Sequence, residues 1–137
     1  MPKKARFTNH IGLQFEQPAQ GRSRCLLKVQ DLHRNGTGVV HGGVLFTLAD
    51  TAMGAALYST LEDGEICATI ECKITYFKPV FDGELVCTGE TISRGKTVAA
   101  MEASIHLDGV LVAKASGSFA IFKRKTDAAI AHPSEAT

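Results

Sequence analysis

The chain has 137 residues, 45% of them hydrophobic and 21% charged, as expected of one globular domain rather than a disordered or fibrous chain. Fifteen lysines and arginines against fourteen acids leave a net charge of +1, which excludes a strong overall attraction to nucleic acid or anionic membranes. No stretch reaches the ~18 apolar residues of a membrane span. The basic N-terminus has no apolar segment behind it, so we expect a cytoplasmic protein.

Apolar periodicity and turn residues predict the elements in chain order. Residues 1–20 are ambiguous, because Ile11, Leu13 and Phe15 alternate in a way that fits a short strand or a lid. A strand is predicted over 24–30, a loop over 31–40 and a helix over 41–60. Four strands follow over 66–80, 84–93, 97–107 and 110–122, separated by hairpin-like turns at 82–83, 94–95 and 108–109. The tail, 123–137, is predicted to be frayed or loosely helical.

The predicted helix is apolar on most sides, so we expect it to be buried. The first of the four strands alternates strictly from Ile66 to Tyr76, which predicts one buried face with Thr69 on the opposite side. A curved antiparallel sheet wrapped around one central helix, an α+β arrangement in a single domain with a core over about 24–122, satisfies both patterns. One helix cannot cover both faces of the sheet, and we therefore expect a second copy to associate with it.

Asp50 is the only charged residue between positions 35 and 61. It shares a helix face with four uncharged residues, and a solvent-facing stripe of that length normally carries several charges. An isolated carboxylate on a mostly buried helix is costly unless it is paired, hydrogen-bonded or functional. A functional acid, a satisfied structural aspartate and a solvent-exposed one all remain open. The other residues of the stripe are Thr47, Thr51, Gly54 and Tyr58.

The sequence His41-Gly42-Gly43 opens this helix. Glycines there allow a ligand to approach the backbone, and free amides at the positive end of the helix dipole can hold a carbonyl oxygen that becomes an oxyanion. The alternative is a plain loop-to-helix joint. Together with Asp50, an acid about two turns further on, the two glycines form a candidate acyl-transfer site.

Metal ligation is not expected. The five histidines are scattered without an H-x-x-x-H pair, and the four cysteines lack C-x-x-C spacing. The cysteines, at positions 25, 67, 72 and 87, lie in predicted strands and are interpreted as buried thiols.

The segment 35–50, NGTGVVHGGVLFTLAD, resembles the signature of the hotdog-fold acyl-CoA thioesterases, in particular their phenylacetate-pathway-like (PaaI-like) branch. The likeness continues through 69–79, TIECKITYFKP, and covers roughly residues 24–122. It implies a long helix wrapped by a curved antiparallel sheet and hydrolysis of acyl-CoA to a free acid and CoA. It also implies no cofactor beyond the CoA of the substrate, and a homodimer, with the pairing of two dimers into a tetramer left open.

By this resemblance, Asp50 matches the catalytic acid, as general base or nucleophile. The Gly42 amide, with Gly43 beside it, matches the oxyanion donor. Asn35 matches a side chain that helps hold the carbonyl or the attacking water, and His41 one that orients the loop.

Thr69 matches a hydroxyl that approaches the acid from the neighbouring subunit, with an ordinary strand threonine as the alternative. Arg94, Gly95 and Lys96 resemble the family's turn near CoA, where they could contact phosphate, although a basic hairpin tip is also an ordinary solvated turn. Residues 123–125 are a second candidate phosphate patch, with simple solubility as the alternative.

Tyr58 and Phe77 are candidates for an acyl pocket, with core packing favoured for Phe77. The acyl group stays open among aryl-acetyl, hydroxylated aromatic, short-chain and medium-chain thioesters. Two other functions remain as alternatives: a non-catalytic acyl-CoA-binding domain, and a hotdog hydratase or dehydratase, whose acid-and-histidine spacing is absent here.

Overall fold

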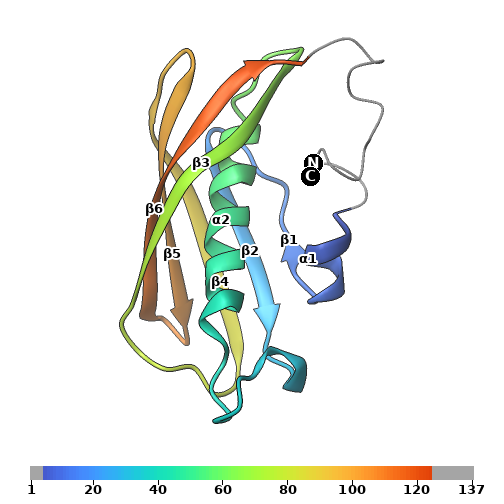
Figure 1. Cartoon of the computed structure of the whole chain (residues 1–137), viewed down its shortest axis with the longest axis vertical. Helices are drawn as coiled ribbons and strands as arrows, with labels where there is room; N and C mark the ends of the chain where they lie inside the picture. Colours follow the sequence, from blue (N-terminus) through green and yellow to red (C-terminus); the bar gives the residue numbers. More distant parts are fainter. Residues whose placement is uncertain (1–4, 125–137) are drawn as a thin grey trace.

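A computed structural model describes residues 5–124 and shows one curled sheet around one long helix (Figure 1). Six strands form the sheet, all pairs are antiparallel, and the order is β1-β2-β4-β5-β6-β3. The α+β expectation is therefore confirmed. In chain order the elements are α1 (Arg6–His10), β1 (Gln14–Phe15), β2 (Arg22–Lys28), the 3-10 helix η1 (Asp31–His33), α2 (Gly42–Tyr58), β3 (Glu65–Tyr76), β4 (Glu84–Arg94), β5 (Val98–Leu107) and β6 (Val110–Lys123).

The position of β3 differs from the simple succession of hairpins predicted from the sequence. The strand does not pair with β4 but lies at the sheet edge beside β6. Residues 77–83 cross between the two strands, and Val80 in this connection is buried and accepts a hydrogen bond from the Val40 amide (2.8 Å). Asp82-Gly83 is therefore part of a core-anchored crossover rather than a hairpin turn, and one long edge of β3 has no strand beside it among the described residues.

Helix α2 packs into the concave side of the sheet, as its apolar composition predicts. It approaches β4 so closely that a methyl group at Gly89 would overlap the Ala52 carbonyl. Fully burying a large apolar side chain contributes about 1.5–3 kcal/mol, so this contact face anchors the helix firmly. Its buried residues are Leu45, Leu48, Ala49, Ala52, Met53, Ala55, Ala56 and Leu57.

A β-bulge interrupts β3 at Ile70, where the register with β6 shifts between Thr69 and Glu71. Because an extra residue reverses the side-chain alternation, Cys67 packs against the core before the bulge and Cys72 after it. The predicted single buried face from Ile66 to Tyr76 is therefore wrong for the first part of the strand. The bulge places Thr69 on the same side as α2.

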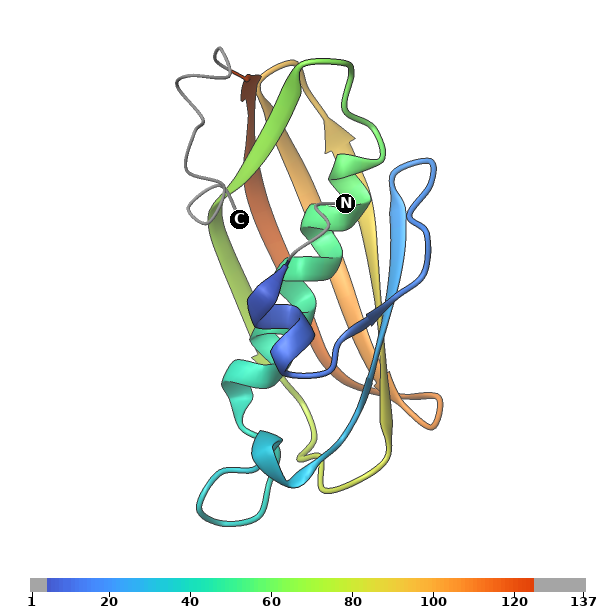
Figure 2. The ribbon, with the colours of Figure 1, turned by 90° about the vertical axis from the view of Figure 1, so that its right-hand side faces the viewer.

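The N-terminal segment forms α1 and the short β1, a helix that the alternation of residues 11–15 does not predict. In Figure 2 α1 lies in front of α2, and Figure 1 shows the two helices standing apart. The buried His33 ring ties this segment down: Nδ1 accepts from the Gln30 amide (2.9 Å) and Nε2 donates to the Ile11 carbonyl (2.7 Å).

At the other end, β6 extends through Lys123, one residue beyond the predicted strand, and both it and Arg124 are exposed. The rest of the predicted tail, 125–137, lies outside the described residues, as does position 125 of the candidate phosphate patch. Across residues 5–124, no helix has the length and hydropathy needed to cross a bilayer.

Candidate active site

Asp50 lies half-buried on the open face of α2, where the helix faces edge strand β3. The Thr69 hydroxyl donates to Asp50 Oδ1 at 2.8 Å. This bond fixes one carboxylate oxygen and leaves the other for a further partner. Of the three interpretations left open above, full solvent exposure is excluded.

Thr69 and Asp50 meet within one chain, not across two subunits as the resemblance implied. The bulge is the physical reason, since it turns Thr69 from the predicted outer face towards the helix. The expectation that this hydroxyl comes from a neighbouring subunit is thus corrected for this structure.

The two glycine amides at the start of α2 differ in their hydrogen bonding. His41 is the N-cap, and its Nδ1 accepts from the Gly43 amide at 2.8 Å. Its carbonyl accepts from the Val44 amide at 2.9 Å. Within residues 5–124 the Gly42 amide has no hydrogen-bond acceptor. Gly42, rather than Gly43, therefore has the amide that is free to bind a ligand oxygen.

Asn35 shapes the loop that leads into this helix start. Its Oδ1 accepts from the Thr37 amide (2.9 Å), the Thr37 hydroxyl (2.7 Å) and the Val39 amide (3.2 Å). The side-chain NH₂ makes no hydrogen bond within the described part of the chain. Its proposed contact with a carbonyl or a water stays a prediction.

Tyr76, which the sequence places in the core-facing set, is instead 48% exposed and meets the helix start. Its hydroxyl donates to the Gly42 carbonyl at 2.7 Å. No local signal in the sequence predicts this contact, because only the crossing of β3 over α2 brings the two residues together.

Beside Gly42 lies a shallow hollow of about 320 Å³, and Phe77 lines it. Phe77 is 53% exposed, so the favoured prediction of core packing for this residue is wrong. Tyr58 is exposed at the far end of α2 and does not line the hollow. The lining residues are Val39, Val40, Gly42, Leu45, Tyr76, Phe77, Lys78, Pro79 and Val80.

Cys72 lies on β3 between Thr69, which contacts Asp50, and Tyr76, which contacts Gly42. Burial first, and then the negative charges of Asp50 and Glu71, raise the pKa of its thiol to about 11. Burial, and then the neighbouring Cys72, also raise the pKa of Tyr76. Both groups are therefore neutral near pH 7, and Asp50 faces a protonated thiol and not a competing charge. The thiol is one of four free cysteines.

The acid and the free amide lie on one helix but far apart along it. Asp50 follows Gly42 by eight residues, which at ~1.5 Å per residue is about 12 Å along the axis. Reacting atoms must approach to about 3–3.5 Å. The separation is therefore too large for the Asp50 carboxylate and the Gly42 amide of one chain both to contact one carbonyl group directly.

The predicted phosphate turn is only partly available for a ligand. Arg94 donates to Glu65 Oε1 (2.7 Å) and to the Gly95 carbonyl (2.8 Å), so its guanidinium already has partners. The pKa of Glu65 is lowered, first by a hydrogen bond from the Glu62 amide and then by Arg94. Lys96 is exposed at the hairpin tip. Phosphate binding by this turn stays a prediction.

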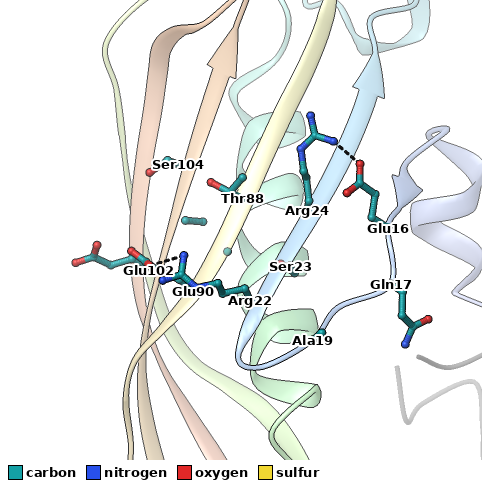
Figure 3. Close-up of a pocket in the computed structure, with 12 residues that line it drawn as sticks. Glu16, Gln17, Ala19, Arg22, Ser23, Arg24, Thr88, Glu90, Glu102 and Ser104 are labelled. Carbon is teal, nitrogen blue, oxygen red and sulfur yellow. Dashed lines mark hydrogen bonds and ion pairs between the residues drawn. The ribbon is translucent and has the colours of Figure 1, made fainter.

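A larger hollow, about 460 Å³, lies on the side of β2, β4 and β5 that faces away from α2 (Figure 3). Its arginines are already paired, Arg22 with Glu90 (3.6 Å) and Arg24 with Glu16. Glu102 adds a third acid, so these charges do not favour an anionic ligand. Over residues 5–124 there is also no group of three or more histidines, cysteines and acids placed to hold a metal ion.

Comparison with known proteins identifies the family. Residues 37–114, more than half of the chain and including Asp50, Gly42 and Thr69, match the model of the thioesterase superfamily. The chain belongs to the thioesterase superfamily. The hotdog-fold thioesterase resemblance is thus confirmed, and the protein is an enzyme that hydrolyses thioesters.

The chain is similar to a named acyl-CoA thioesterase in sequence and to two solved structures in fold. Human acyl-coenzyme A thioesterase 13 is 35% identical over 101 residues, covering 72% of this chain and 71% of that enzyme. A conserved protein of Pseudomonas aeruginosa superposes with a TM-score of 0.83 at 34% identity, covering 86% of this chain and 94% of that one. The PaaI protein of the E. coli phenylacetic acid degradation operon superposes with a TM-score of 0.79 at 26% identity, covering 87% and 86%.

Proposed function

We propose that this thioesterase hydrolyses acyl-CoA to a carboxylic acid and free CoA. In this proposal the Asp50 carboxylate is the general base or nucleophile, and the Gly42 amide is the oxyanion donor. The observation that carries the proposal is the hydrogen bond from Thr69, which orients the one charged side chain of a buried helix on its open face. The similarity to an acyl-CoA thioesterase supports the substrate class.

The chemistry requires few groups. As general base, Asp50 takes a proton from water as the water oxygen attacks the thioester carbonyl carbon. The Gly42 amide stabilises the tetrahedral oxyanion. Collapse breaks the C–S bond, and the CoA thiolate, whose thiol pKa is near ~8.5 by analogy with cysteine, leaves and is protonated. In the covalent alternative, the Asp50 carboxylate attacks the carbonyl carbon first, the C–S bond breaks and the CoA thiolate leaves, and water then hydrolyses the resulting anhydride.

A homodimer completes the site in this proposal, because Asp50 and Gly42 of one chain lie too far apart. The unpaired edge of β3 is a ready template for pairing with a second β3 strand. Antiparallel pairing centred on Lys73, with Ile70 as the extra residue of the bulge, sets Tyr76 of one copy opposite Thr69 of the other. Tyr76 contacts Gly42 and Thr69 contacts Asp50, and cross-strand neighbours lie about 4.5–5.5 Å apart. Such a register would bring the amide of one copy to the acid of the other.

Substitution of the oxyanion donor tests the proposal. Gly42→Pro removes the amide hydrogen, and proline is favoured at the first position of a helix. The preceding His41 has φ −60° and ψ 135°, which is the backbone region that a residue before proline prefers. Gly42→Ala is the matched control: it adds a similar Cβ, which would lie 3.1 Å from the Tyr76 hydroxyl, but keeps the amide.

We expect Gly42→Pro to lower kcat for release of CoA from a panel of acyl-CoAs by about 10²–10³ relative to Gly42→Ala. Equal activities of the two variants would contradict the assignment of the amide. A wild-type enzyme that binds acyl-CoAs without releasing CoA would instead favour a non-catalytic binding domain.

A further inference from the structure

We infer that Tyr76 is a positioning residue for the reaction: its hydroxyl holds Gly42 where the free amide can meet the substrate oxygen. This inference rests on the proposed function of Gly42. It assigns a role to Tyr76, a residue to which the family resemblance gave none.

The contacts of Tyr76 with the helix start are close and specific. The hydroxyl donates to the Gly42 carbonyl at 2.7 Å, and a methyl group at Gly42 would lie 3.1 Å from the hydroxyl oxygen and 3.2 Å from Cζ. The ring therefore occupies the space that the missing side chain leaves. Tyr76 is also the last residue of β3, so the contact links the end of the edge strand to the first turn of α2.

Gly42 needs such a support because the helix begins with two glycines, which have the largest backbone freedom. His41 fixes the Gly43 amide, but within residues 5–124 it makes no hydrogen bond to the peptide groups of Gly42. An oxyanion donor must be held within about 0.5 Å of its productive position. Tyr76 is the side chain that bonds to Gly42 directly, and the raised pKa keeps it a neutral donor near pH 7.

Two other roles would produce the same contact. Tyr76 could serve only the stability of the fold, or it could act only as a wall of the adjacent hollow, which it lines together with Gly42 and Leu45. Removing the hydroxyl and keeping the ring separates these roles. A wall keeps its shape in Tyr76→Phe, whereas a positioning hydrogen bond is lost.

The experiment compares Tyr76→Phe with Ser23→Ala. Ser23 is a matched control because its hydroxyl also joins a strand to an α2 carbonyl, that of Ala52, but on the buried side of the helix away from Asp50. We expect Tyr76→Phe to lower kcat about tenfold, the loss of one hydrogen bond that acts in the transition state, with KM within about twofold. Ser23→Ala should lower Tm and leave kcat unchanged below the melting range.

A second measurement reads Gly42 directly. In ¹⁵N-labelled protein, binding of a 2-oxoalkyl-CoA, which keeps the carbonyl but cannot be hydrolysed, should shift the Gly42 amide resonance. The shift should be smaller in Tyr76→Phe and unchanged in Ser23→Ala. A structural role alone would leave this shift at its wild-type size in both variants.

Three results would overturn the inference while the proposed function stands, provided that turnover depends on Asp50. These are an unchanged kcat in Tyr76→Phe, a rise in KM alone, and an equal loss of kcat in Ser23→Ala. Absence of CoA release by the wild-type enzyme would contradict the proposed function itself, and the kinetic role of Tyr76 with it.

Discussion

Mixed dimers offer a sharp prediction, because the structure divides the proposed site into two halves. Asp50 and Thr69 form one half within a chain, and Gly42 lies about 12 Å along the same helix. Each complete site of a symmetric dimer would then take its acid from one copy and its amide from the other. Variants in different halves should rescue each other, and variants in the same half should not.

The first pair is Asp50→Ala with Gly42→Pro, each inactive as a homodimer. In the heterodimer, one site combines the intact acid of one chain with the intact amide of the other, and the second site carries both defects. Purification through two different affinity tags isolates the heterodimer. Its CoA release should therefore reach about half of the wild-type rate.

The second pair is Asp50→Ala with Thr69→Ala, whose heterodimer has no intact acid half and should stay near the level of its parents. Recovery in this second pair would refute the placement of Thr69 beside the acid of its own chain. No recovery in the first pair, in heterodimers that bind acyl-CoA normally, would refute the shared site.

The remaining predictions concern stability and the electrostatics around the site. Gly89→Ala should destabilise the fold by about 1–3 kcal/mol, measured by urea unfolding, because the new methyl group overlaps a carbonyl of α2; wild-type stability would contradict this packing. Hydrogen bonds lower the pKa of Glu65 in the folded protein. Its bond to Arg94 therefore stabilises the protein fully at pH values above 4.5, the ordinary pKa of glutamate, and this stabilisation is lost as the pH falls through the lower pKa of the folded state. Arg94→Gln should thus lower Tm near pH 7, with a deficit that shrinks on acidification, and a pH-independent deficit would count against this account. Asp50→Asn should lower the pKa of Cys72 from about 11, because it removes a nearby negative charge, and should speed alkylation of this thiol by iodoacetamide at mildly alkaline pH. The rate can be followed by peptide mass spectrometry, and an unchanged rate would argue against the proximity of Asp50 and Cys72.

Much of the fold follows from local pattern. The apolar stretch around Asp50 predicts the buried helix, and its bounds differ from the structure by two residues or fewer. Period-two runs and glycine turns predict β4, β5 and β6 within about a residue, and Asp108-Gly109 forms the expected tight hairpin with positive φ at both residues. In each case the signal lies in neighbouring residues, which is why one sequence suffices.

The features that the sequence did not predict depend on contacts between segments distant in the chain. Strict alternation in β3 hides the bulge at Ile70, since an extra residue leaves no mark in composition. The crossover that sets β3 beside β6 contains the buried Val80, and a turn signal at 82–83 does not reveal either feature. These two features together put Thr69 against Asp50 and Tyr76 against Gly42, and therefore decide how the candidate site is built.

The most direct test of the central claim is CoA release by wild type and Asp50→Asn across a panel of acyl-CoAs, with Asp63→Asn as a control in an exposed loop. Asparagine keeps the size of the side chain and an oxygen that can accept from Thr69, so the fold should persist with an unchanged Tm. We predict loss of kcat by about 10²–10⁴, the usual contribution of a general base, and wild-type turnover in the control. A folded Asp50→Asn enzyme that retains most of its turnover would contradict the account.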